Sequence, residues 1–345
     1  MSPDSAPRRF RVGLDQYGLF PLALSPLDTL RWAAGHGAEG VAFSGFSAER
    51  HAAFTREELT DLAAFARQHD LYLEWGGARH IPRDMTTWER CALDEHNRRV
   101  AEQASCLDVR VVRSCSGGLM RWNPEAPPTE TLLRDTAEAL RGQRGMLRDL
   151  GVVLAIETHF EFTSHELVRL FDWCEAEPGD WLGVCLDTMN LLTMLEDPLS
   201  ASRRLLPWVV STHIKDGGVL VGANGLSTFT APIGTGVVDL EAILSSLATL
   251  DRGIHLSIED HGGSFDLPIF DPAFLSRFPD LGAGELARLI GLAVRTSARP
   301  ACRPLPRPDW PRVCEQRLAN DLVALRQLAG SAPIGTDFTF CDRKK

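Results

Sequence analysis

Short apolar runs alternate with longer stretches of helical periodicity, and this alternation limits the possible fold more than any other feature of the sequence. The apolar runs are rich in Val, Ile and Leu and are expected to form strands: FRVGLD (10–15), EGVAF (39–43), LYLEW (71–75), VRVVR (109–113), VVLAIE (152–157), LGVCLD (182–187), VVSTHIK (209–215) and IHLSIE (254–259). Strands that alternate with helices form βαβ units, and such units build a parallel sheet.

Helices are expected between these strands, for example at 26–37, 56–70, 129–151 and 239–251. The segment 56–70 carries an apolar stripe made of Leu59, Leu62, Ala63 and Ala66. A stripe of this kind is typical of a helix that packs outside a sheet.

Eight strand–helix units over residues 10–298 predict an α/β fold, a closed (β/α)8 TIM barrel. An open, doubly wound sheet would give the same alternation. However, no GxGxxG follows the first strand, where FRVGLDQYGLF stands instead, and this disfavours a dinucleotide-binding fold. The loops after strands 1, 3, 4 and 7 are long, and in a barrel these loops form the catalytic face.

Residues 299–345 form a separate C-terminal extension in this interpretation. RPACRPLPRPDWP (299–311) is rich in proline and is expected to be an extended connector. A helix is expected at 311–330, packed on the barrel or on a partner subunit, which is compatible with a homodimer. The remaining residues are expected to be a mobile tail.

The composition limits the possible binding partners of the protein and its cellular location. The net charge of −10 and the pI near 5.5 argue against nucleic acid and against an anionic membrane surface. No apolar run approaches the roughly 20 residues needed to span a bilayer. The N-terminus lacks an apolar signal core, and the eight cysteines are scattered without a CxxC pair. The expected location is the cytoplasm.

Four successive strands end in, or contain near their end, a side chain that can bind a metal: Glu157, Asp187, His213 and Glu259. In a closed barrel, the carboxyl ends of neighbouring strands converge on one pocket. Three crowded carboxylates would repel one another unless a divalent cation neutralised them. Three carboxylates and one imidazole suit Mn²⁺ best, with Mg²⁺, Co²⁺ and Zn²⁺ as alternatives. A single acidic residue at the end of a strand is usually only a polar loop residue. Potential metal ligands at the ends of four successive strands, by contrast, predict one metal site.

The blocks IETHF, LDTMN, THIKDG and SIEDHGG, together with PIGTGVVDLEAIL, resemble the xylose-isomerase-like superfamily of sugar isomerases and epimerases. The resemblance covers about residues 10–297. It implies that Glu157, Asp187, His213 and Glu259 ligate one divalent metal, and that the two glutamates move protons. The chain departs from several members in carrying Asn190, where they carry His three residues after the strand-6 aspartate. The substrate therefore does not transfer from the family.

The same residues suggest a reaction. A small carbohydrate-like keto compound, bound through its carbonyl and neighbouring hydroxyl, would lose a proton to one glutamate and regain one from the other. Return to the same carbon is epimerisation, and return to the adjacent carbon is aldose–ketose isomerisation. The same enediolate would also serve a lyase, such as a decarboxylase, a dehydratase or an enzyme that cleaves a C- or O-glycoside.

Further candidates for substrate binding lie near the expected rim: His159, Asn190, Lys215, His80, Arg113 and His261. Each has an ordinary structural alternative, such as a solvated loop position for Lys215 or a turn position for Asn190. Asp216 would orient a ligand or cap the following turn. No cluster of arginines is visible at the rim, which favours an unphosphorylated substrate.

Two other functional classes agree less well with the sequence. A DNA-repair endonuclease of the related barrel type would need more histidines and a basic face. A non-enzymatic binding barrel is disfavoured because an open metal site seldom serves structure alone.

Overall fold

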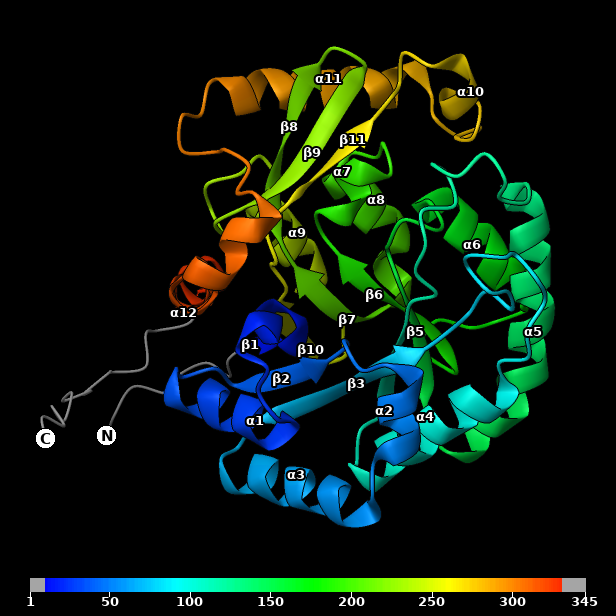
Figure 1. The fold of residues 1–345 in the computed structure, drawn as a ribbon, viewed down its shortest axis with the longest axis vertical. Coiled ribbons are helices and arrows are strands. Elements are labelled where there is room, and N and C mark those ends of the chain that lie inside the picture. Colours follow the sequence, from blue (N-terminus) through cyan, green and yellow to red (C-terminus); the bar gives the residue numbers. More distant parts are fainter. Residues whose placement is uncertain (1–9, 331–345) are drawn as a thin grey trace, which may run out of the picture.

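The computed structural model describes residues 10–330, and its core is a closed barrel of eight parallel strands surrounded by helices (Figure 1). The order around the barrel is β1-β10-β7-β6-β5-β4-β3-β2. The predicted (β/α)8 barrel is therefore confirmed. Its strands are β1 (Phe10–Asp15), β2 (Gly40–Phe43), β3 (Tyr72–Ala78), β4 (Val111–Ser114), β5 (Val153–Glu157), β6 (Leu182–Asp187), β7 (Val209–Ile214) and β10 (Ile254–Ile258).

The barrel strands are buried on both faces, which explains why they appear in the sequence as continuous apolar runs. Every residue of β5 and β6 is buried, Cys185 among them. The carboxyl ends of the strands therefore hold the first polar side chains after each run.

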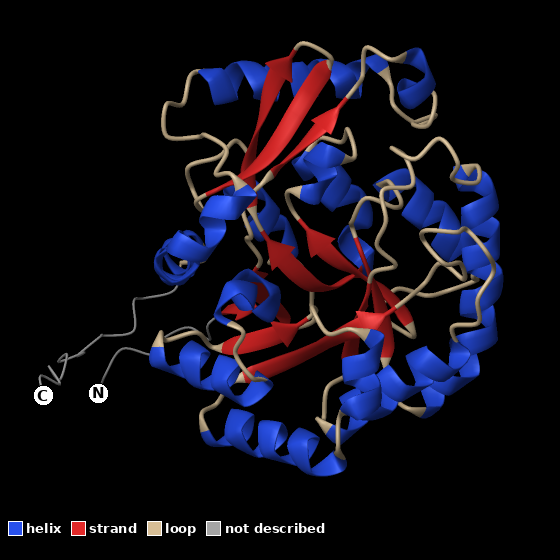
Figure 2. Cartoon of the chain, in the orientation of Figure 1, coloured by secondary structure: helices blue, strands red, loops and turns tan. Residues whose placement is uncertain are grey.

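Helices cover the outside of the barrel (Figure 2). In α3, the buried residues are the predicted stripe of Leu59, Leu62, Ala63 and Ala66. The helices are α1 (Pro26–Gly35), α2 (Ala48–Ala53), α3 (Arg56–Gln68), α4 (Asp94–Cys106), α5 (Thr129–Asp149), α6 (Ser164–Trp173), α7 (Asn190–Thr193), α8 (Pro198–Leu205), α9 (Leu240–Leu247), α10 (Pro272–Leu275), α11 (Ala283–Ser297) and α12 (Trp310–Leu328). Three short 3-10 helices are η1 (Gln16–Leu22), η2 (Leu206–Trp208) and η3 (Arg307–Asp309).

A second, three-stranded antiparallel sheet stands beside the barrel, where the sequence predicted only long loops (Figures 1 and 2). It contains β8 (Asp216–Gly222) and β9 (Gly225–Ala231), which follow β7, and β11 (Ser264–Leu267), which follows β10. Helix α11 packs against β8, and Val219 N donates a hydrogen bond to Thr296 Oγ1 at 3.1 Å. The two insertions thus form one substructure at the carboxyl side of the barrel.

The C-terminal helix α12 packs on the barrel, one of the two alternatives that the sequence left open. Leu318, Leu322 and Leu325 are fully buried. Arg317 donates to Asp260 Oδ2 at 2.6 Å and to Asp321 Oδ2 at 2.9 Å. Because Asp260 directly follows β10, this helix holds one segment of the barrel rim. The predicted tail lies outside the described residues.

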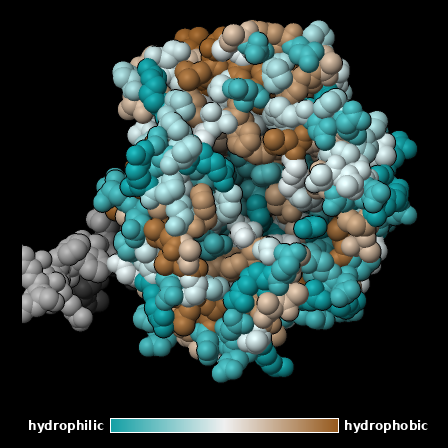
Figure 3. All heavy atoms as spheres, viewed as in Figure 1, coloured by the Kyte–Doolittle hydropathy of each residue, from teal (hydrophilic) through white to brown (hydrophobic). Residues whose placement is uncertain are grey.

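The surface is hollowed between the second sheet and the barrel, and the atoms visible in this recess are mostly hydrophilic (Figure 3). In the described part of the chain, no helix is both long and apolar enough to cross a bilayer.

Candidate metal centre

Glu157, Asp187, His213 and Glu259 come together at the carboxyl ends of four neighbouring strands. Glu157 ends β5, Asp187 ends β6, His213 lies in β7 and Glu259 directly follows β10. Each offers a ligand atom, and these atoms all lie within 4.8 Å of one another. All four side chains are buried. We refer to these four residues as the quartet.

His213 lies at the centre of the quartet's contacts. Its Nδ1 is 3.1 Å from Glu157 Oε1 and 3.6 Å from Glu259 Oε2. Its Nε2 is 3.4 Å from Asp15 Oδ2. One imidazole therefore contacts carboxylates on both of its nitrogens.

Asp15 was missed by the sequence analysis, although it ends an apolar strand in the same way as Asp187. It is fully buried, and its Oδ1 accepts hydrogen bonds from Tyr17 N at 2.8 Å and Ser44 Oγ at 2.6 Å. The position of Asp15 below His213 makes it a residue that orients the imidazole.

Two cations compensate the acidic side chains, the half-buried Arg113 and the buried Lys215. The guanidinium of Arg113 pairs with Glu157. The ammonium of Lys215 lies 2.8 Å from Asp187 Oδ2 and also pairs with Glu259. Lys215 is thus buried and paired, and the alternative of a solvated loop lysine is wrong.

These cations control the ionisation of both glutamates. Burial alone would raise the pKa of Glu157, but the charges of Arg113 and His213 hold that pKa well below its usual value. Burial opposes ionisation of Glu259 in the same way, yet Lys215 and His213 lower its pKa to about 2. Both glutamates are therefore carboxylates at neutral pH.

Asp187 provides evidence that the site suits a cation. Its Oδ1 accepts hydrogen bonds from Met189 N at 3.0 Å and Asn190 N at 2.9 Å. Its Oδ2 is buried and forms an ion pair with Lys215 Nζ at 2.8 Å. Burial and the charges of Glu259 and Glu157 nevertheless raise the pKa of Asp187, so a further positive charge among these carboxylates would favour its ionised form. Three carboxylates and one imidazole are suitable donors for one divalent ion.

A second group of possible ligands lies nearby: Cys115, His159 and Glu161. His159 Nδ1 is 2.8 Å from Glu161 Oε2, and the other oxygen of Glu161 accepts hydrogen bonds from Ser116 N at 3.1 Å and Gly117 N at 2.7 Å. Both oxygens of this carboxylate are thus engaged, and Glu161 fixes the ring of His159 and the loop after β4.

The recess above the quartet is a cavity of about 210 Å³. Its lining contains five of the six substrate-binding candidates from the sequence: Arg113, His159, Asn190, Lys215 and His261. It is completed by Tyr17, Ser44, Gly45, Phe160, Glu259, Phe265 and Arg307.

His80 is the candidate that does not line this cavity. Its ring is fully buried, with Nδ1 3.1 Å from Ser114 Oγ. Burial lowers the pKa of His80 to about 4, so the ring is neutral. His80 thus lies behind the cavity lining, and its role in substrate binding stays a prediction.

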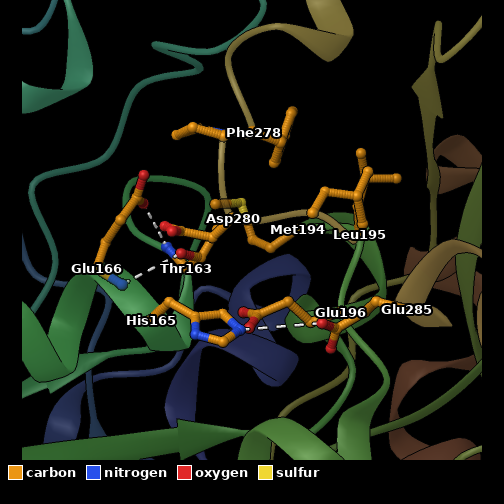
Figure 4. Close-up of a pocket in the computed structure, with 11 residues that line it drawn as sticks. Thr163, His165, Glu166, Met194, Leu195, Glu196, Phe278, Asp280 and Glu285 are labelled. Atoms are coloured by element: carbon orange, nitrogen blue, oxygen red, sulfur yellow. Dashed lines mark hydrogen bonds and ion pairs between the residues drawn. The ribbon is translucent and has the colours of Figure 1, made fainter. Parts of the chain in front are cut away.

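Another pocket lies away from the quartet, between α6 and the segment that carries α10 and α11 (Figure 4). Three glutamates surround it: Glu166, Glu196 and Glu285. Burial raises the pKa of Glu196 to about 7. Its cavity of about 10 Å³ is too small for a sugar, so we assign these residues to packing.

Fold and site together define a TIM-barrel protein with a polar cavity over a group of potential metal ligands. The sequence pattern of the xylose isomerase-like TIM barrel family matches residues 30–277. The chain belongs to this family, as its sequence motifs suggested.

Individual relatives are distant. The uncharacterized protein YihM of Escherichia coli is 27% identical over 197 residues, which cover 55% of this chain and 58% of the relative. The 3-oxo-isoapionate decarboxylase of Pectobacterium atrosepticum is 26% identical over 170 residues, which cover 48% of this chain and 57% of that enzyme. These matches span less than two thirds of either relative.

Among solved structures, a D-psicose 3-epimerase crystallised in the presence of D-fructose is similar, with a TM-score of 0.63 at 15% identity. The match covers 93% of this chain and 100% of the epimerase. At this identity the similarity establishes the shared fold.

Proposed function

We propose that this protein is a divalent-metal-dependent isomerase or epimerase of a sugar or a sugar-like keto compound. The observation that carries the proposal is the meeting of two ionised glutamates, from β5 and from the end of β10, in one buried quartet below a polar cavity. The similarity to a D-psicose 3-epimerase supports the same class of reaction.

Glu157 and Glu259 are proposed to move the proton. One carboxylate takes the proton from the carbon next to the substrate carbonyl and becomes a carboxylic acid. In an isomerisation this same group returns the proton to the adjacent carbon; in an epimerisation the other glutamate, which must first take up a proton from solvent, donates it to the opposite face of the enediolate. Arg113 and Lys215 keep these carboxylates ionised and in place. His159 and Asn190 would donate hydrogen bonds to substrate hydroxyls; Asn190 Nδ2 is buried and has no partner among the described residues.

The quartet would hold one divalent ion, for which we propose Mn²⁺ ahead of Mg²⁺, Co²⁺ or Zn²⁺. A bound ion would supply a Lewis acid for the substrate carbonyl and a counter-charge for the carboxylates. Metal analysis of the purified protein by mass spectrometry identifies the ion.

A lyase is the second candidate, favoured by the similarity to a 3-oxo-isoapionate decarboxylase. In a decarboxylation, the bond between the carboxylate carbon and its neighbour breaks, CO₂ leaves, and the electron pair forms the enediolate. A glutamate then protonates that carbon. The two candidates share every protein residue and differ in the bond that breaks.

The experiment is incubation of the metal-loaded protein with a panel of keto-sugars and keto-sugar acids in D₂O. An isomerase or epimerase conserves the mass of the carbon skeleton and places deuterium next to the carbonyl. A lyase releases CO₂, water or an aglycone. A product of conserved mass without deuterium would point to hydride transfer and overturn the proton-transfer scheme.

A further inference from the structure

Arg307 brings a positive charge from the C-terminal extension into the wall of the cavity. It begins η3 and lines the same cavity as Lys215 and Glu259. The sequence analysis treated this segment as a connector and missed the residue. The chain reaches the rim here because Leu305 contacts the loop after β10 and Trp310 contacts η1.

Hydrogen bonds on both sides of Arg307 fix its backbone. Before it, Leu305 O accepts a hydrogen bond from Gly263 N at 2.8 Å, next to the loop after β10. After it, Trp310 is fully buried and its Nε1 donates to Gly18 O at 2.9 Å. The guanidinium is therefore delivered to the cavity by an ordered segment.

The exposed side chain of Arg307 contacts the side chains of Tyr17, Phe20 and His261. Its Nη2 donates to Tyr17 Oη at 2.6 Å, and its Nη1 lies 3.2 Å from His261 Nδ1. The guanidinium carbon lies 5.8 Å from the centre of the Tyr17 ring and 5.6 Å from that of Phe20. Among residues 10–330 no carboxylate forms an ion pair with it.

This situation differs from that of the other two cations in the cavity wall. Arg113 is paired with Glu157, and Lys215 is paired with Asp187 and Glu259. A divalent ion in the quartet would add further positive charge. The uncompensated charge of the cavity therefore lies at Arg307, and an anionic ligand would be favoured there.

We propose that Arg307 binds the carboxylate of an anionic substrate, so that the substrate class is a keto-sugar acid. This inference rests on the proposed function. A guanidinium offers five donors in a planar fork that matches a carboxylate, and Tyr17 and His261 engage only part of that fork. Tyr17 acts as a positioning residue because its hydroxyl and ring hold the guanidinium.

The position of Arg307 also bears on the choice between the two candidate reactions. Glu157 pairs with Arg113 and Glu259 with Lys215, so the guanidinium of Arg307 is not occupied by the proton-transferring groups. Binding a carboxylate as an anion stabilises the ground state and opposes its loss as CO₂. The proposed arrangement therefore favours a rearrangement that retains the carboxylate.

The test is isothermal titration calorimetry of the metal-loaded protein with D-gluconate and with D-glucitol. These probes share their carbon chain and differ at C1, which is a carboxylate in one and a CH₂OH group in the other. Wild-type protein is expected to bind gluconate at least about tenfold more tightly, the scale of one charge-assisted hydrogen bond. Arg307→Gln is expected to remove this preference and to leave glucitol binding unchanged.

Arg303→Gln is the matched control because Arg303 belongs to the same segment, is exposed and does not line the cavity. It is expected to behave as wild type. Tyr17→Phe is expected to weaken gluconate binding less than Arg307→Gln, since it removes one support of the guanidinium and retains its charge. Arg307→Lys should recover part of the preference.

Three results would overturn the inference: no preference for gluconate in the wild type, an equal loss in Arg307→Gln and Arg303→Gln, or tighter binding of D-glucitol 6-phosphate than of gluconate. Because binding is measured without turnover, failure of the inference and failure of the proposed function give different results. Intact gluconate preference without exchange of a substrate proton in D₂O would refute the proposed function alone.

Discussion

Glu157 and Glu259 are buried carboxylates that stay ionised because each has a cation beside it. Removing such a charge from water is costly, and the cost is offset only when the partner is close and well placed. Arg113 and Lys215 meet this condition from opposite sides of the quartet. At the scale of single residues, the site is therefore preorganised to hold two bases of low pKa.

Replacing either glutamate by glutamine tests this assignment. Glu157→Gln and Glu259→Gln keep the shape of the side chain but lose the proton acceptor and a metal ligand. Each is expected to lower kcat by about 10²-fold or more, the usual contribution of a general acid or base. The measurement is the rate of deuterium incorporation from D₂O, with metal content determined on the same samples. Exposed Glu125→Gln is the control, and wild-type rates in either active-site variant would refute the scheme.

The residues that could be identified from the sequence are those that end an apolar strand. Asp187 is visible because LGVCLD ends in an acid, and Asp15 carried the same signal in FRVGLD but was not used. Arg307 carried no such signal. Its contact with His261 joins residues 46 positions apart in the chain, and only the path of the folded extension creates that contact.

At the scale of elements, the loop after β9 folds around Asp216. The carboxylate of Asp216 accepts hydrogen bonds from Gly217 N at 2.8 Å, Gly234 N at 3.0 Å, Gly236 N at 2.8 Å and Val238 N at 3.2 Å. Of the two roles considered for Asp216, the structure supports capping of this turn. The loop connects the second sheet to α9, so these hydrogen bonds fix one end of that sheet.

Gly236→Ala should disrupt this arrangement. A Cβ at Gly236 would lie 2.1 Å from Asp216 Oδ1 and 2.4 Å from Gly217 O, and either contact forces the loop away from the carboxylate. Overpacking and the loss of hydrogen bonds to a charged group together predict a loss of about 3 kcal/mol in the free energy of unfolding. Urea denaturation at pH 8, followed by circular dichroism, measures this loss.

Gly142→Ala is the matched control for that substitution. Gly142 lies in α5, and its Cβ would meet no atom within 4 Å. Alanine has the higher helix propensity, so this variant should gain about 0.5–1 kcal/mol. If both substitutions changed the free energy of unfolding equally, the close contacts at Gly236 would not contribute to stability.

The elements differ in how well the sequence reveals them. The barrel strands are visible because burial on both faces requires continuous apolar runs. Strands β8 and β9 cannot be identified in this way, because their segments GGVLVG and GLSTFTA are rich in small residues and β8 becomes exposed toward its end. One signal was present, displaced by one residue: the sequence holds Asn-Gly at 224–225, a strong hairpin indicator, whereas the two loop residues are Ala223 and Asn224 because Gly222 pairs with Gly225. The pairing with β11 connects segments that local patterns do not relate.

At the scale of the whole molecule, the quartet links half of the barrel. Strands β10, β7, β6 and β5 are consecutive neighbours in the closed sheet, and each contributes one member. An ion that binds all four side chains would connect four neighbouring strands that lie up to about a hundred residues apart in the sequence. Metal binding should therefore stabilise the native state against global unfolding.

Addition of Mn²⁺ at about 100 times its dissociation constant should stabilise the native protein by about 2.7 kcal/mol, because the unfolded chain does not present the four ligands together. In a chain of this size that corresponds to a rise in Tm of about 4 °C, and EDTA should reverse it. Differential scanning calorimetry with and without the metal measures the shift.

Asp187→Asn is the informative variant. Its amide oxygen can still accept the hydrogen bonds from Met189 N and Asn190 N, while the second carboxylate oxygen is lost as a ligand. Its Tm should respond to Mn²⁺ much less than that of the wild type. An equal response would place the stabilising ion elsewhere in the molecule and separate metal binding from the quartet.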